Sequence, residues 1–302
     1  PACSHVSTIS RNLGPLTVSA VGQLVKAELG GVGLDDEVVE QIASRANGSP
    51  LAVKEYLHAM LDAGLLRPLK DGWRVDATGL DDLDLPGDVM QLVLRRVDEL
   101  SAEANDLLLK AAVFGQRFSL DVLRDADGGE ALFSAISEAV SARIVEHVDD
   151  EVYAFLHTRL RESLLTRLDE ETLRSTHHAL ATTLDARERS HAREVYELAR
   201  HYAAGYVSEA PGRVFETNFE AGRVALADNA FDEAHRFLST ACEVAESFDL
   251  PMSPALQSAM GEACAATGRI DRAVDWYEQA VERVDDPVER ARIHARIAGV
   301  YM

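Results

Sequence analysis

Apolar residues recur at helical spacing along most of the chain. On both sides of the turn signal Asn47-Gly48-Ser49-Pro50 they lie three or four positions apart, which predicts two helices that meet at this turn. An earlier helix is expected from about Val18, with Thr17 as its N-cap. The stretch Gly72-Trp73-Arg74-Val75 is typical of a short strand or loop. An acidic linker that ends at Pro86 then predicts a domain boundary.

The pattern changes from helical spacing to alternation near residue 144. Before that point the sequence predicts several helices, one of which begins after an N-cap at Ser101. Alternating apolar residues before and after Asp149-Asp150 predict a β-hairpin with an acidic tip. Three helices closed by a two-stranded wing are typical of a winged-helix domain. His157 then lies where the second strand passes into a helix, which is expected at about residues 158–168.

An internal repeat with a shift of 39 residues occupies the C-terminal part of the chain. Its small residues would let the two helices of one repeat approach closely, and a ring such as Tyr277 would fill the gap to the neighbour. The matched pairs are Gly222 and Gly261, Ala234 and Ala273, Leu238 and Tyr277, and Ala241 and Ala280. A third copy is expected within residues 292–302. With Gly268 at the turn between two helices, this pattern resembles the tetratricopeptide repeat.

Composition limits the classes of partner. The 302 residues are 47% hydrophobic, which suits folded domains, and a net charge of −21 repels polyanions such as duplex DNA and anionic membranes. Cys3, Cys242 and Cys264 have neither metal-ligand spacing nor the even number of a disulfide framework, so we expect small apolar packing residues in a cytoplasmic protein. No segment of the sequence is typical of a membrane span or a signal peptide.

Few motifs suggest catalysis. The sequence contains no glycine-rich phosphate loop followed by Lys-Ser or Lys-Thr, no HExxH metal motif and no hydrolase elbow. The glycines within residues 30–33 lack a lysine and a preceding buried strand, so we interpret them as a loop. His177 and His178 would point to different faces of a helix, which favours a solvent-exposed pair over a metal site. We expect no catalysis by this chain alone.

Two short motifs occur in an informative order. Gly48-Ser49-Pro50-Leu51-Ala52 resembles the Gly-Leu-Pro-Leu-Ala motif of nucleotide-binding domains in plant resistance proteins, apoptotic scaffolds and bacterial signal-transduction ATPases of the STAND class. Further along, Phe155-Leu156-His157-Thr158 takes the place of that class's Met-His-Asp motif, with leucine for methionine and threonine for aspartate. A repeat array then follows, as in that class. The chain therefore resembles the lid, winged-helix and tetratricopeptide portion of large bacterial regulators, in which such modules are fused to protein kinase or nucleotide cyclase domains.

The resemblance implies a nucleotide switch. Pro50 would pack on the adenine ring, and His157 would contact the terminal phosphate of ADP and hold the domains closed. A proline at the start of a helix offers a donor-free apolar face, and an imidazole at a helix N-terminus can donate to a phosphate oxygen. The alternatives are an ordinary helix-initiating proline and a core histidine. ADP or ATP with Mg²⁺ would bind in the complete protein, and no cofactor is expected for this chain alone.

The predicted fold class is mainly α-helical. Residues 1–20 are interpreted as the end of a preceding nucleotide-binding core, 21–86 as a helical lid domain, 87–172 as a winged-helix domain with a small β-hairpin, and 173–302 as a solenoid similar to tetratricopeptide repeats. Because the chain begins at Pro1 and stops within a helical pattern, we expect it to be a piece of a longer protein. The complete protein would be an ATPase, and this piece would read the nucleotide.

Expected partners follow from these parts. The repeats would bind a partner protein, the lid and winged helix would dock on the chain's own N-terminal ATPase core, and no nucleic acid or membrane is expected. A scaffold that binds proteins without nucleotide is the alternative function. A DNA-binding regulator is less favoured, because residues 119–142, where a recognition helix would lie, hold more acids than bases.

Overall fold

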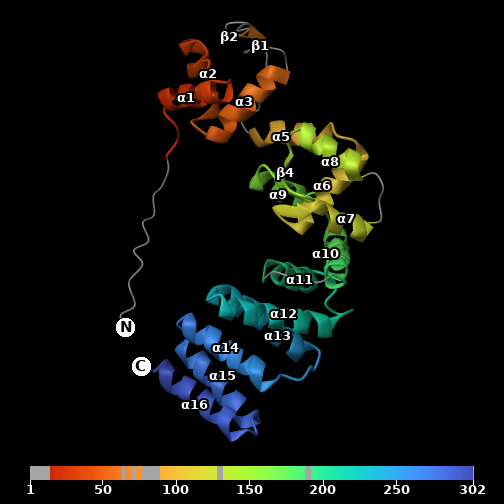
Figure 1. The fold of residues 1–302 in the computed structure, drawn as a ribbon, viewed down its shortest axis with the longest axis vertical. Helices are drawn as coiled ribbons and strands as arrows, with labels where there is room; N and C mark the ends of the chain where they lie inside the picture. Colours follow the sequence, from red (N-terminus) through yellow and green to blue (C-terminus); the bar gives the residue numbers. More distant parts are fainter. Residues whose placement is uncertain are drawn as a thin grey trace. The chain divides into compact units, whose positions relative to one another are not determined.

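The fold is mainly helical, with two small antiparallel sheets (Figure 1). We analysed a computed structural model, which describes residues 14–62, 65–69, 72–75, 89–127, 132–187 and 192–301. Contacts divide the chain into two compact units between Leu100 and Ser101. The predicted mainly α-helical class is therefore confirmed. Cys3 lies outside the described residues.

The first unit is a small helical domain with a β-hairpin. Its elements are α1 (Val18–Glu28), α2 (Asp36–Ala46), α3 (Pro50–Asp62), β1 (Leu66–Leu69), β2 (Gly72–Val75) and α5 (Val89–Asp98). Residues from α1, α2 and α3 such as Val25, Ile42 and Leu57 form one buried core. Trp73 of β2 packs against this core and donates from its indole nitrogen to the carbonyl of Leu29, at 3.1 Å. The predicted strand in residues 72–75 is thus present and is tied to the end of α1.

Local capping explains where these helices begin and end. The Thr17 hydroxyl accepts from the Ala20 N–H at 3.3 Å, which confirms the predicted N-cap of α1. Helix α2 ends at Asn47, which takes the left-handed conformation with φ of 48°. Gly48 follows with φ of 68°, a conformation that favours glycine. The turn between α2 and α3 therefore lies where the sequence predicts it.

Helix α5 is held to α3 by a buried ion pair. Arg96 lies 2.9 Å from the carboxylate of Glu55, which is almost fully buried. We predicted a boundary between residues 86 and 87, whereas contacts group α5 with the first unit and divide the chain after Leu100. The boundaries of the four predicted parts stay predictions. The acidic linker that motivated this boundary lies outside the described residues.

The second unit begins with a module of helices and a three-stranded sheet. Its elements are α6 (Ala102–Phe114), β3 (Arg117–Ser119), α7 (Leu120–Asp127), α8 (Leu132–Ser141), β4 (Val145–Asp149), β5 (Val152–Phe155) and α9 (Thr158–Leu165). The strands lie in the order β3-β5-β4, and both pairings are antiparallel. The predicted hairpin is present, but strand β3, which the sequence analysis did not predict, adds a third strand beside it.

The hairpin turns one residue later than predicted. Asp149 pairs with Val152, so the two turn residues are Asp150 and Glu151. Asp150 has φ of 35°, and aspartate tolerates positive φ better than most residues. A register shift between His147 and Asp149 accompanies the turn. The turn is therefore placed by the residue that accepts the left-handed conformation, and the prediction of Asp149-Asp150 was wrong by one position.

A carboxylate from another helix completes the cap of α6. The Ser101 hydroxyl accepts from the Ala104 N–H at 3.2 Å, which confirms Ser101 as the N-cap. Glu138 of α8 accepts from both the Ser101 hydroxyl, at 2.5 Å, and the Ser101 N–H, at 2.9 Å. The hydroxyl and the N–H both lower the pKa of the Glu138 carboxyl. This contact fixes α8 against the beginning of α6.

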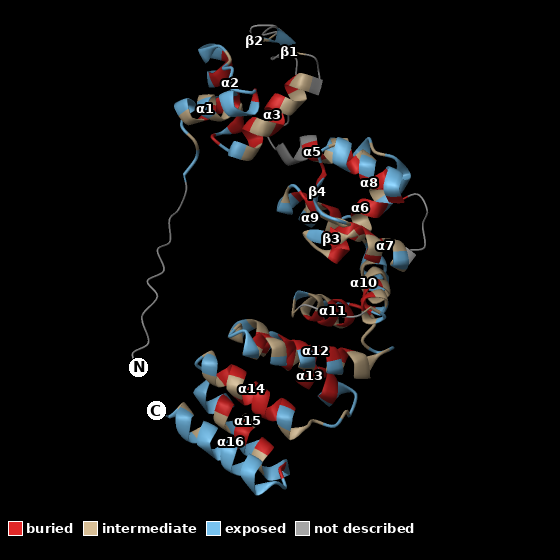
Figure 2. Ribbon diagram, viewed as in Figure 1, coloured by how far each residue is buried: buried red, intermediate tan, exposed pale blue. Residues whose placement is uncertain are grey.

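Helices that pack in sequence order complete the second unit. They are α10 (Glu170–Asp185), α11 (Ala192–Ala204), α12 (Pro211–Ala227), α13 (Phe231–Ser247), α14 (Pro254–Ala266), α15 (Ile270–Arg283) and α16 (Pro287–Val300). Each helix from α10 to α15 contacts the next. Buried residues line the faces between successive helices, while the outer faces are exposed (Figure 2). This arrangement is solenoid-like, as predicted.

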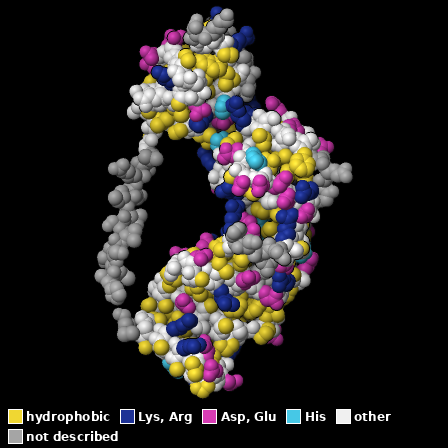
Figure 3. Space-filling view, in the orientation of Figure 1, with side chains coloured by type: hydrophobic (Ala, Val, Ile, Leu, Met, Phe, Trp, Pro, Cys, Tyr) yellow, Lys and Arg dark blue, Asp and Glu magenta, His cyan; other side chains and the backbone are white. Residues whose placement is uncertain are grey.

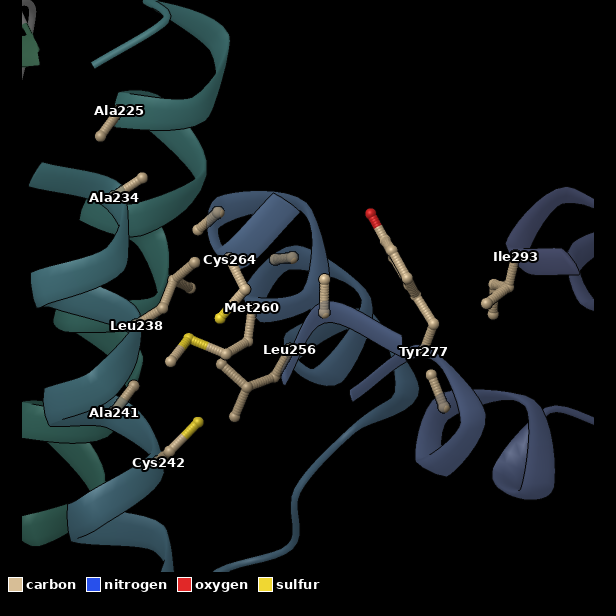
Figure 4. Packing of buried hydrophobic residues seen from close by; sticks show 14 of the residues in the cluster. Ala225, Ala234, Leu238, Ala241, Cys242, Leu256, Met260, Cys264, Tyr277 and Ile293 are labelled. Carbon is tan, nitrogen blue, oxygen red and sulfur yellow. The ribbon is translucent and has the colours of Figure 1, made fainter. Parts of the chain in front are cut away.

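The repeat is built on glycines that face larger side chains. A Cβ atom placed on Gly222 would lie 2.5 Å from the Leu238 side chain, and one on Gly261 would lie 2.8 Å from the Tyr277 ring. The same contact therefore occurs in both copies of the predicted repeat, between residues at matched positions. We predicted that Tyr277 fills the gap to the neighbour; its ring also lies against Gly261 of its own repeat. Figure 4 shows how Leu238 and Tyr277 enter the core of the array.

The last described helix continues the array. Ile293 of α16 is buried in the same core, and Ile297 is packed against it, which agrees with a third copy of the repeat. Cys242 and Cys264 are both buried free thiols, as predicted, and burial raises the pKa of Cys242 to about 12. Within the described part of the chain, no helix is long and apolar enough to span a membrane.

Candidate functional site

Pro50 occupies the first position of α3. The Ser49 hydroxyl accepts from the Ala52 N–H at 3.4 Å and so caps the helix ahead of Pro50. Pro50 itself is exposed. Its ring therefore presents an apolar, donor-free surface at the positive end of a helix, which is the placement that the sequence predicts.

Gly48 of the same motif has a structural role. A Cβ atom there would lie 2.6 Å from the Cβ of Pro15 and 2.7 Å from the carbonyl oxygen of Leu16. The Leu16 N–H donates to the Gly48 carbonyl at 2.8 Å. The segment that precedes α1 is thus seated on the turn that precedes α3, and only glycine leaves room for it.

His157 is the N-cap residue of α9. It follows directly on β5, because the Leu156 N–H still donates to the carbonyl of Ile144, at 3.1 Å. The His157 backbone is extended, with φ of −134°, and its carbonyl accepts from the Leu160 N–H at 3.1 Å. The ring does not cap the helix, and the residue is half-buried. The predicted strand-to-helix junction is therefore confirmed.

The first turn of α9 is locally positive. It carries no acidic residue, while Thr158 and Arg159 are both exposed. The helix N-terminus adds the partial positive charge of its dipole. In a chain with a net charge of −21, this turn is suited to an anion. On the face shown in Figure 3, Lys and Arg side chains are interspersed with Asp and Glu.

Pro50 belongs to the first compact unit and His157 to the second. The structure does not test their roles.

The glycines within residues 30–33 form the loop that we predicted. The Gly31 N–H donates to the Lys26 carbonyl at 2.8 Å and the Gly30 N–H to the Ala27 carbonyl at 3.4 Å, so both close the end of α1. Neither N–H is therefore directed at a phosphate.

His177 is half-buried and pairs with the buried His201, so our interpretation of a solvent-exposed pair was wrong for this residue. Its Nδ1 lies 2.8 Å from Nδ1 of His201, which is 3% exposed. Burial, with a smaller contribution from the positive charge of Arg161, lowers the pKa of His177 to about 4 and that of His201 to about 3. Both rings are therefore neutral at neutral pH. His178 lies 3.7 Å from Glu209 on another face of the helix.

The histidine pair lies at the end of α6. The ring of His201 packs on that of Phe114, with centroids 5.7 Å apart. Arg161 of α9 donates from Nε to the Ala112 carbonyl at 2.8 Å. Among the described residues no group of three or more His, Cys, Asp or Glu could hold a metal ion. This cluster is therefore a polar joint between helices, which sequence spacing gave no means to predict.

Comparisons with known proteins give limited information. A family profile described as a domain of unknown function, DUF8739, matches residues 17–67, which run from the start of α1 into β1. The crystal structure of a STAND protein with a tetratricopeptide-repeat sensor from Pyrococcus horikoshii matches with 12% identity and a TM-score of 0.37. The match covers 95% of this chain and 50% of that one, so the chain spans about half the length of that structure. At this score the likeness establishes neither fold nor function. The search of curated proteins finds no match.

Proposed function

We propose that this chain is the regulatory portion of a nucleotide-switched signalling ATPase. In this proposal, the helical unit that carries Pro50 and the module that carries His157 read whether ADP or ATP is bound. The helical array that follows binds a partner protein. Catalytic groups and the phosphate-binding loop would belong to the ATPase core of the complete protein, and the chain alone would not hydrolyse ATP.

The observation that carries this proposal is the place of His157. It stands at the N-terminus of α9, next to exposed Thr158 and Arg159, in a turn without acidic residues. A phosphate oxygen there could accept from the imidazole and from free N–H groups of the first helical turn. The loss of a phosphate contact at this position would weaken the docking of the module on the ATPase core in one nucleotide state. A ligand shifts a two-state equilibrium by such a difference in contacts between the two states.

Pro50 fits the other end of a nucleotide. Its exposed ring can pack on a flat base, because it offers carbon surface and no competing donor. The chain's own residues would thus bind the base through Pro50 and orient the phosphate through His157. Bound nucleotide would supply the negative charge that His157 and Arg159 recognise, and Mg²⁺ would bind with the phosphates in the complete protein.

The solenoid supports a second candidate, a protein-binding scaffold without nucleotide. Helices α12 to α15 stack through matched glycine contacts, which is how repeat arrays build extended binding surfaces. In this reading Pro50 only starts a helix and His157 only packs. Nucleotide affinity measured on variants separates the two candidates.

The test is the substitution His157→Ala in the complete protein. We expect ADP affinity to fall about tenfold to a hundredfold and ATP affinity to fall less, because a charge-assisted hydrogen bond contributes about 1.5–3 kcal/mol. Isothermal titration calorimetry with each nucleotide measures both values. His147→Ala is the matched control, since His147 lies on the hairpin of the same module. Earlier melting of His157→Ala with unchanged ADP affinity would make His157 a packing residue.

A further inference from the structure

The C-terminal end of α6 is completed by side chains from two other helices. The last carbonyls of a helix have no partner within it and must find one elsewhere when buried. Here the Gly115 N–H donates to the Ala111 carbonyl, Arg161 of α9 donates to the Ala112 carbonyl, and the ring of His201 of α11 packs on that of Phe114. Residues 111–114 are all buried, so water cannot take over these roles.

The histidine pair links α10 to α11. Nδ1 of His177 lies 2.8 Å from Nδ1 of His201. In a neutral imidazole one ring nitrogen donates and the other accepts, so one of the two rings donates from its Nδ1 and the other accepts. The ring of His201 also packs on that of Phe114, with centroids 5.7 Å apart, which brings the pair to the end of α6.

We propose that Arg161, His177 and His201 form a rigid joint which fixes the helix pair α10 and α11 to α6 and α9, so that they move as one body. Helices α9, α10 and α11 each contribute one of these side chains. Arg161 and His201 contact the end of α6, and His177 contacts His201. A movement of α9 would then be carried directly into the first helix pair of the array. This proposal does not depend on nucleotide binding, because it rests only on contacts within the second unit.

The residue at the centre of the joint, His201, is buried. Exposed ion pairs elsewhere in the array, such as Arg193 with Glu197 at 2.6 Å, have one partner open to solvent and contribute little. His201 is nearly inaccessible, and its ring also packs on Phe114. A buried polar group that loses its partner keeps the full cost of desolvation. Breaking one bond of the joint should therefore loosen every helix that shares it.

Hydrogen exchange on the full chain tests this proposal. In His201→Phe, which keeps an aromatic ring and loses the hydrogen bond to His177, we expect amides at the end of α6 and in α10 and α11 to exchange about tenfold faster together. His201→Gln retains a donor and an acceptor and should restore much of the protection. Arg161→Met, which leaves the histidine pair in place, should give the same pattern as His201→Phe even where that variant folds poorly.

Arg213→Met is the matched control. Arg213 joins α12 to α10 through Asp185, with its Nε 3.0 Å from a carboxylate oxygen. The substitution therefore breaks a contact in the array that lies outside the joint. We expect faster exchange in α10 and α12 without a change at the end of α6. Exchange that rises in α11 alone in His201→Phe, or that stays unchanged at the end of α6 in both joint variants, would overturn the proposal.

Discussion

The pair formed by the half-buried His177 and the buried His201 predicts a specific loss of stability in mild acid. The perturbation is a change from pH 7.5 to pH 5.5. Folded His177 and His201 have pKa values of about 4 and about 3, so both stay neutral over this range. In the unfolded chain each has an ordinary pKa of about 6.5 and binds a proton at pH 5.5. The unfolded state therefore gains protons that the folded state cannot take.

The sign and the magnitude follow from this difference. Because the folded pKa values are lowered, the contribution to stability is fully present above about pH 6.5 and is lost as pH falls towards the folded values. Each histidine that stays neutral in the folded state lowers the free energy of unfolding by about 1.4 kcal/mol at pH 5.5 relative to pH 7.5. The pair together lowers it by about 3 kcal/mol. The charged groups that face the pair are Arg161 and Arg200, and both oppose protonation.

The assay is amide exchange of α11 at the two pH values, corrected for intrinsic rates. We compare the natural chain with the double variant His177→Gln/His201→Gln, which cannot titrate at this joint. The difference in opening free energy between pH 7.5 and 5.5 should shrink by about 3 kcal/mol in the double variant. Phe114→Leu is the control, because it weakens the same core without removing a titrating group. Equal pH dependence in the natural chain and the double variant would refute the reasoning.

Three further predictions concern packing. Gly48→Ala should destabilise the first unit by about 2 kcal/mol or more, because it adds a Cβ at positive φ against two backbone atoms of Leu16; urea unfolding followed by Trp73 fluorescence measures this. Gly261→Ala should lower the stability of the array, measured by hydrogen exchange, by about 1–3 kcal/mol. Gly299→Ala in α16 should be neutral or stabilising, because a Cβ there meets nothing within 4 Å. Arg96→Leu should cost about 3–5 kcal/mol because it leaves a buried carboxylate without this cation, and the double variant with Glu55→Leu should recover most of the loss.

Local signals predicted the elements that local chemistry determines. Thr17 and Ser101 were assigned as N-caps from residue type and position, and both hydroxyls accept the expected backbone bond. The repeat was predicted because its small and large positions recur at a fixed shift, and the contact of Gly261 with Tyr277 gives that recurrence a cause. Such features depend on a few neighbouring residues, so the sequence alone is sufficient to find them.

Features that depend on distant residues could not be predicted in this way. Strand β3 has three residues and is a strand only because it pairs with β5, more than thirty residues later. His177 finds His201 on another helix, and neither position differs in pattern from an exposed histidine. Pro50 and His157 were each found from a short motif, and their roles stay predictions.

The seat of the N-terminal segment on Gly48 has a mechanical consequence. If the chain were pulled at Gly14, the load would reach the Leu16–Gly48 hydrogen bond and the contact of Pro15 with Gly48 before it reached α1. Pro50 is two residues from that point, at the start of α3. Tension on the incoming chain would therefore strain the turn in front of Pro50 first, so that this turn would respond to force before any helix of the unit unwinds.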